Sequence, residues 1–235
     1  MSDAARTTIL LTGFQPFPTQ PVNATEVLVP QLAAAARRAF PDIRVAHEIL
    51  PTEWQSAPTR IEQLLMQHEP DVALFFGISS KARGFEIEMR GLNHRRESTD
   101  AAGVELKKGV LWHGGPRALP SRLPAGDIAR RLRARRIPVL VSRDAGGYLC
   151  NAILYHALLL APHIRHLARI GFVHVPADIA VPGRRHTIVQ RTCPMSWPDA
   201  VTGGVEIIGA CIGRAPRRVR SCETTSRGHP LRSER

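Results

Sequence analysis

The chain alternates between short apolar runs and longer segments in which apolar positions recur every three or four residues. The short runs are rich in β-branched and aromatic residues, as strands are. The longer segments have the spacing of helices that bury one face. We therefore predict strands at 8–12, 43–50, 71–77, 84–93, 137–142 and 168–176, and helices at 24–39, 57–68, 125–136, 151–161 and between Pro198 and Arg214.

This alternation predicts an α/β fold, because a helix after a strand returns the chain to a parallel neighbouring strand. The run "DVALFFG" at 71–77 is typical of a central strand that is covered on both faces. We expect a single domain over residues 1–213, in which a mainly parallel twisted sheet lies between two helical layers (three-layer α/β/α). Ligands bind beyond the carboxyl ends of the strands in such sheets, so those ends are the first place to look for a site.

The chain of 235 residues carries a net charge of +12, which makes nucleic-acid binding worth testing against the sequence. Residues 214–235 hold seven arginines and two glutamates with very few apolar residues, which predicts a disordered basic tail. A second cluster, "RRLRARR" at 130–136, is interpreted as the solvated face of a helix. No aromatic residues lie between these arginines to stack on bases. We expect no nucleic-acid partner, and a basic binding module without enzymatic activity is the alternative class.

The N-terminal segment and the cysteines indicate the compartment. The opening "MSDAARTTILLTGF" has an early Asp, a short apolar run and no small-residue cleavage site, so we expect no secretory signal. No apolar run approaches the roughly 18 residues that span a membrane. The cysteines at 150, 193, 211 and 222 lack paired spacing, which indicates neither a zinc site nor a disulfide framework. We expect a cytoplasmic protein with reduced thiols and no membrane partner.

Three segments carry candidate chemistry. Cys150 follows a predicted strand and opens a predicted helix, where free N–H groups stabilise an anion, so it is either a nucleophile or a small core residue. His174, in "GFVHVP", is either a general base at a strand end or a core histidine. Glu86 and Glu88 point to the same side of a strand; one of them orients the imidazole, or both form a surface ladder.

Four segments together resemble the pyroglutamyl peptidase I family of cysteine peptidases. The segment "ILLTGFQPFPTQPVNAT" resembles the family's TGF-x-PF opening, and "GFEIEMRGLN" resembles the segment with its catalytic glutamate. "SRDAGGYLCNAILY" resembles the SN-x-AG-x-x-x-CN signature around the nucleophile, and "GFVHVP" resembles the F-I-H-V-P segment with the catalytic histidine. The segments occur in the family's order over about residues 8–213, and the basic tail lies outside the resemblance.

The resemblance implies a cysteine exopeptidase that hydrolyses the amide bond after an N-terminal pyroglutamate through an acyl-thioester, without metal or cofactor. Members commonly form tetramers, so it also implies a homotetramer. The register puts the catalytic glutamate five residues before Asn93. The implied catalytic residues are Cys150, His174 and Glu88, and the implied substrate-binding residues are Phe14, Phe17, Asn23 and Asn93.

The sequence departs from the family pattern at two loops and one signature position. The stretch "GISSKAR" at 77–83 lacks the family's glycine pair. In "HRRESTDAAGV" the position of the family's arginine near the oxyanion site falls on Ser98, with Arg95 or Arg96 as substitutes if the loop is shifted. The asparagine of the SN pair is Arg143. These changes leave a second interpretation open: an altered or catalytically weak hydrolase of the same fold that acts on another small N-acyl or cyclic amide.

Overall fold

The computed structural model describes residues 6–184 and 193–217 and confirms an α/β fold with a mainly parallel sheet. Six strands form this sheet: β1 (Thr8–Phe14), β2 (Arg44–Leu50), β3 (Val72–Ser79), β4 (Phe85–Glu88), β9 (Val139–Ser142) and β10 (Arg169–Pro176). Their order is β2-β1-β3-β10-β4-β9. All neighbours are parallel except β10 and β4, which are antiparallel. β10 therefore lies between two strands that are close to each other in the sequence.

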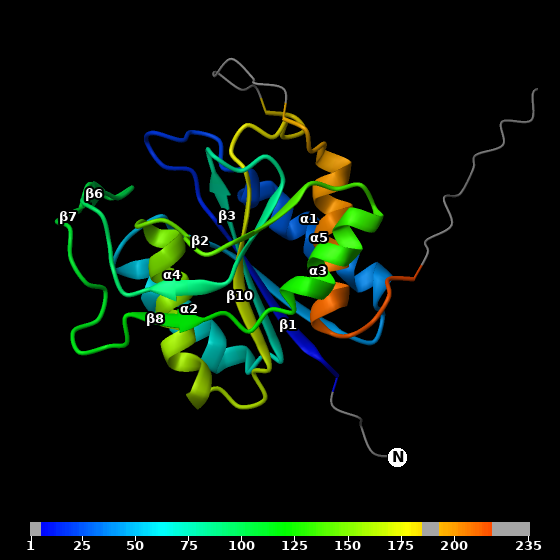
Figure 1. The fold of residues 1–235 in the computed structure, drawn as a ribbon, viewed down its shortest axis with the longest axis horizontal. Helices are drawn as coiled ribbons and strands as arrows, with labels where there is room; N and C mark the ends of the chain where they lie inside the picture. Colours follow the sequence, from blue (N-terminus) through cyan, green and yellow to red (C-terminus); the bar gives the residue numbers. More distant parts are fainter. Residues whose placement is uncertain (1–5, 185–192, 218–235) are drawn as a thin grey trace, which may run out of the picture.

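Helices cover both faces of the sheet (Figure 1). Helices α1 (Ala24–Ala39), α3 (Ala125–Ala134) and α5 (Trp197–Cys211) lie on one face. Helices α2 (Ser56–His68) and α4 (Leu149–Leu160) lie on the other, and a short 3-10 helix, η1 (Ala161–His163), follows α4. Side chains alternate along β3, so Leu74 and Phe76 enter the first core while Ala73 and Phe75 enter the second. This two-sided burial explains the continuous apolar run at 71–77.

The turn from β1 into α1 is held by one asparagine and one glycine. The Oδ1 atom of Asn23 accepts a hydrogen bond of 3.1 Å from the backbone N–H of Thr25 and so caps the helix. A side chain at Gly13 would put a Cβ 2.7 Å from the carbonyl oxygen of Thr25. The close approach of strand and helix therefore requires glycine at this position. Despite Pro30 in its interior, α1 covers the predicted range.

The predicted strand at 84–93 is wrong as a single element. It breaks at Met89, after which β5 (Arg90–Leu92) leaves the main sheet and pairs with β8 (Ala118–Pro120) in a separate two-stranded sheet. A Cβ at Gly91 would lie 2.8 Å from the backbone of Tyr155, so β5 packs directly on α4. The two-residue strands β6 (Ser98–Thr99) and β7 (Glu105–Leu106) form a further hairpin that the sequence pattern did not predict. Strands this short carry too few residues to show a period of two.

Two expectations concern a membrane-spanning helix and the basic C-terminal tail. Within residues 6–184 and 193–217, no helix has the length and apolar content to cross a membrane. Of the predicted basic tail, residues 218–235 lie outside the described residues. Its first residue, Arg214, packs against the domain, because its carbonyl oxygen accepts a hydrogen bond of 2.7 Å from Arg131.

Candidate active site

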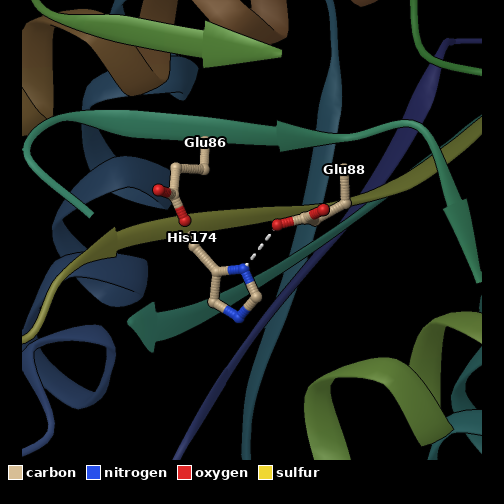
Figure 2. Close-up of side chains that lie close together, drawn as sticks. All are labelled: Glu86, Glu88 and His174. Carbon is tan, nitrogen blue, oxygen red and sulfur yellow. Dashed lines mark hydrogen bonds and ion pairs between the residues drawn. The ribbon is translucent and has the colours of Figure 1, made fainter. Parts of the chain in front are cut away.

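Strand pairing brings one histidine and two carboxylates together. Phe85 and Ile87 of β4 enter the core under α1, α3 and α5, so Glu86 and Glu88 face the layer of α2 and α4. In the antiparallel register His174 lies opposite Glu86, and Phe172 lies opposite Glu88. All these side chains therefore share one face of the sheet. Figure 2 shows both carboxylates close to the imidazole of His174.

The carboxylate of Glu88 interacts with the imidazole of His174. The Nδ1 atom of His174 and Oε1 of Glu88 are 2.9 Å apart, and only 5% of His174 and none of Glu88 is exposed. The second oxygen of Glu88, Oε2, is buried and has no hydrogen-bond partner among the described residues. A buried carboxylate in such surroundings is stable only beside a positive charge. The arrangement therefore favours the imidazolium form of His174 and fixes the plane of its ring.

Cys150 completes a Cys–His–Glu chain. Burial alone would lower the pKa of His174, but the negative charge of Cys150 and its hydrogen bond to the imidazole act in the opposite direction. Together with the hydrogen bond and charge of Glu88 they raise the pKa of His174 to about 10. Since Nδ1 is hydrogen-bonded to Glu88, Nε2 is the ring nitrogen that remains to interact with the sulfur of Cys150. A cysteine, an imidazole and a carboxylate in this order are the arrangement that nucleophilic acyl transfer requires.

The first turn of α4 presents this sulfur to the sheet. Tyr148 occupies the N-cap position in extended conformation without a side-chain cap, and Cys150 is the second residue of the helix. The free N–H groups of this turn favour an anion. Behind the sulfur the space is filled: a Cβ at Gly77 would lie 3.0 Å from Sγ of Cys150 and 2.7 Å from Cζ of Phe172.

The sulfur opens into a cavity of about 580 Å³ that has an aromatic and a polar part. In the aromatic part the rings of Phe17 and Tyr148 are 5.9 Å apart. Trp54, outside the cavity lining, contacts Tyr148 edge-on at 5.3 Å. Burial raises the pKa of Tyr148 to about 12, with the charges of Asp100 and Cys150 adding to the effect, so its phenol stays neutral. The polar part is lined by Ser79, Ser80, Lys81, Glu86 and His174.

The residues implied to bind substrate occupy different places. Phe17 lines the cavity, whereas Phe14 is 3% exposed and lies behind it, with its ring 6.3 Å from that of Phe172. Asn23 is buried at the start of α1 and donates a hydrogen bond of 3.3 Å to the carbonyl oxygen of Gln15. Asn93 binds the backbone of residues 111, 112 and 115. Direct substrate contact by Asn23 and Asn93 stays a prediction, since neither is among the residues that line the cavity.

The two candidate arginines differ in what they contact. Arg95 donates to backbone carbonyl oxygens of Lys107 and Val110 and so braces the 107–110 segment. Arg96 lines the cavity that contains Cys150, and a Cβ at Gly147 would lie only 2.5 Å from its Cγ. Arg96 and Tyr148 are thus cavity residues to which sequence reasoning gave no firm role. The signal for Tyr148 was an aromatic residue two positions before the candidate nucleophile.

Glu86, Glu88 and His174 also form the one group in the described part of the chain that could hold a metal ion, with ligand atoms within 4.8 Å of one another. Binding there through Nδ1 would displace the hydrogen bond between His174 and Glu88. The same atoms therefore serve either a metal or the Cys–His–Glu chain, and the buried hydrogen bond favours the latter.

Part of the basic cluster at 130–136 is neutralised within the fold. Arg131 binds Asp127 at 2.8 Å, and Arg135 binds Glu206 at 2.7 Å. Glu206 is 6% exposed, so these arginines serve the packing of α3 against α5. This use of charge is different from the open basic surface that a nucleic-acid binder presents.

Comparison with known proteins gives the same family from sequence and from structure. The sequence model described as Pyroglutamyl peptidase matches residues 7–208. The pyrrolidone-carboxylate peptidase of Deinococcus radiodurans is 32% identical over 176 residues, which cover 74% of this chain and 80% of the relative. That of Pyrococcus furiosus is 30% identical over 169 residues, or 72% and 80% of the two chains. A crystal structure of the Pyrococcus furiosus protein superposes with a TM-score of 0.76 at 25% identity, covering 88% of this chain and 99% of the other.

Proposed function

Because the chain belongs to the pyroglutamyl peptidase family, we propose that it is a cysteine exopeptidase that removes N-terminal pyroglutamate from peptides. The observation that carries the proposal is the buried hydrogen bond of 2.9 Å between His174 and Glu88, with Cys150 near enough to the imidazole to raise its pKa. A cysteine, a base and a group that orients the base are the parts required for nucleophilic acyl transfer.

In the proposed reaction the thiolate of Cys150 attacks the carbonyl carbon that links pyroglutamate to the next residue. The imidazolium of His174 then gives its Nε2 proton to the departing amine nitrogen, and the C–N bond breaks to leave a thioester. His174, now neutral, takes a proton from water, whose oxygen attacks the thioester. Release of pyroglutamate restores the thiolate and the imidazolium, so all atoms and protons balance. Glu88 orients the ring throughout and holds its charge.

The pyroglutamyl ring is assigned to the aromatic part of the cavity. It is a flat, uncharged lactam, which suits a place against the contacting rings of Phe17 and Tyr148. Phe14 acts on the other side of the site, since its ring contacts Phe172, which in turn contacts the imidazole of His174. Asn23 acts at a distance, since it holds the Gln15 carbonyl oxygen at the start of the segment that carries Phe17.

The oxyanion of the tetrahedral intermediate is assigned to the first turn of α4, with Arg96 as the charged partner. Arg96 lies against Gly147, three residues before the nucleophile, whereas Arg95 is engaged with backbone carbonyl oxygens. Loss of one such donor typically lowers the rate about a hundredfold or more. Arg96→Ala is therefore expected to lower kcat strongly, and Arg95→Ala to act mainly through the 107–110 segment.

The test is release of a fluorophore from a pyroglutamyl amide by the purified protein, with a prolyl amide as substrate control. Cys150→Ala is expected to abolish release, and Cys193→Ala, which removes a thiol elsewhere, is expected to leave it unchanged. Hydrolysis that survives Cys150→Ala, or that favours the prolyl compound, contradicts the proposal. The expected homotetramer is tested separately, by the mass of the protein in solution.

A second candidate is a hydrolase of the same mechanism with another acyl group. The charged side chains of Lys81 and Asp144 along the cavity favour it, since an uncharged lactam does not need them. A panel of amides that differ only in the acyl ring separates the two. Turnover of another ring above the pyroglutamyl compound, lost in Cys150→Ala, supports this alternative.

A further inference from the structure

We propose that Glu86 is a second positioning residue of this site, whose carboxylate faces His174 from the cavity and widens the pH range over which the imidazolium persists. The kinetic consequence rests on the proposed function, whereas the effect on His174 itself does not. Glu86 is distinct from Glu88, because it makes no hydrogen bond to the imidazole and acts through its charge.

The position of Glu86 follows from the strand register. It is the residue directly opposite His174 in the antiparallel pair of β4 and β10, on the same face of the sheet. One of its carboxylate oxygens, one oxygen of Glu88 and one ring nitrogen of His174 lie within 4.8 Å of one another. Figure 2 shows the two carboxylates approaching the imidazole from different sides. Glu86 also lines the cavity, so its charge is felt where the reaction takes place.

The groups around Glu86 determine the pKa of its carboxylate. The side chain of Ser79, which also lines the cavity, lies near its carboxylate and acts to lower its pKa. Burial raises its pKa, opposed by the positive charge of His174 and reinforced by the negative charge of Glu88. Two carboxylates this close are compatible with each other only while the imidazole between them is charged. The other ionisable groups around this site are Cys150 on α4, Tyr148 just before it, Lys81 before β4, and His94, Arg96 and Asp144 on the cavity loops.

The size of the effect follows from the distance. A unit charge about 5 Å away shifts a pKa by roughly one unit when the medium lies between water and the protein interior. The shift is upward for His174, because a negative neighbour stabilises the imidazolium. Removing the charge of Glu86 should therefore move the deprotonation of His174 about one pH unit lower. The alkaline limb of kcat/KM should move in the same direction by the same amount, since it reports the free enzyme.

The experiment compares Glu86→Gln with the wild type by NMR titration of the imidazole signal that His174→Gln removes, and by the pH profile of kcat/KM. The expected result is a downward shift of about one unit in both. Glu105→Gln, which removes a carboxylate from the exposed ion pair with Lys107, is expected to shift neither. Glu86→Asp keeps the charge and is expected to retain the wild-type titration, which separates charge from packing.

Equal midpoints in Glu86→Gln and the wild type overturn the inference, as does an equal shift in Glu86→Asp and Glu86→Gln. The NMR titration needs no turnover. If pyroglutamyl amides are not hydrolysed but the His174 signal shifts as expected, the proposed function fails while the role of Glu86 stands.

Discussion

Gly77 offers the sharpest test of how the sulfur of Cys150 is placed. This glycine lies beside His174 in the parallel pair of β3 and β10. An alanine there would put its Cβ 2.7 Å from Cζ and 2.9 Å from Cε1 of Phe172, and 3.0 Å from Sγ of Cys150. Phe172 is fully buried and in contact with the rings of Phe14 and His174, so it cannot move away without disturbing them. The methyl group must therefore push the sulfur or the aromatic core.

Two magnitudes follow for Gly77→Ala. Overpacking a filled core typically lowers the free energy of unfolding by about 1–3 kcal/mol. Misplacing a reacting atom by about 1 Å lowers a rate by about a hundredfold. We expect a stability loss in this range in urea unfolding and a fall of roughly a hundredfold in amide hydrolysis. Alkylation of Cys150 by iodoacetamide should slow as well, because a sulfur displaced from the imidazole loses thiolate character. Alkylation reports the sulfur without reference to any substrate.

The matched control is Gly126→Ala. Gly126 lies in α3, and a Cβ there has nothing within 4 Å. We expect unchanged alkylation of Cys150 and a gain in stability of about 0.4–1 kcal/mol, because alanine restricts the unfolded chain. If Gly77→Ala is as stable as the wild type and its cysteine reacts at the wild-type rate, the packing argument behind the sulfur is wrong.

Two further predictions concern the support and the charge of the site. Asn151→Ala removes three buried hydrogen bonds, of 2.8 and 2.7 Å to the backbone of Leu92 and 2.9 Å to that of His94, and should lower the free energy of unfolding by about 3 kcal/mol in urea; an unchanged midpoint would contradict the anchoring of β5 to α4. Because the pKa of His174 is raised from 6.5 to about 10, the stability it contributes is complete below pH 6.5 and lost as the pH rises through about 10. Urea unfolding should therefore show a decline over that range, and Cys150→Ala should make it shallower, since the charge of Cys150 is a major cause of the shift; equal declines in both proteins would refute this.

The main sheet could be predicted because its strands are buried on both faces. Residues 71–77 are apolar after Asp71, and residues 168–176 are apolar apart from Arg169 and His174; the ends of both predictions agree with the observed strands within two residues. The break at Met89 could not be predicted in the same way. It depends on Gly91 packing against Tyr155, a residue more than sixty positions further along the chain. Local alternation of apolar and polar residues continues through 84–93 and carries no sign of that contact.

The candidate site likewise combines features that the sequence predicts with features that depend on long-range contacts. Which of Glu86 and Glu88 bonds to the imidazole depends on the register of two strands 86 residues apart, and alternation alone puts both on one face. The family resemblance selected Glu88, and the structure gives that residue the hydrogen bond. The choice between Arg95 and Arg96 depended on the path of a loop with two-residue strands, for which the sequence has no periodic signal.

The insertion of β10 between β3 and β4 has a consequence for how the chain acquires its fold. β3 and β4 are complete by residue 88, but the strand that joins them begins only at residue 169. During synthesis both strands therefore expose an unpaired edge while roughly eighty further residues are added. Contacts of such long range form slowly and leave apolar edges open to association in the meantime. The same insertion brings His174 to Glu88, so the buried histidine–glutamate pair and protection from aggregation arise in one late step.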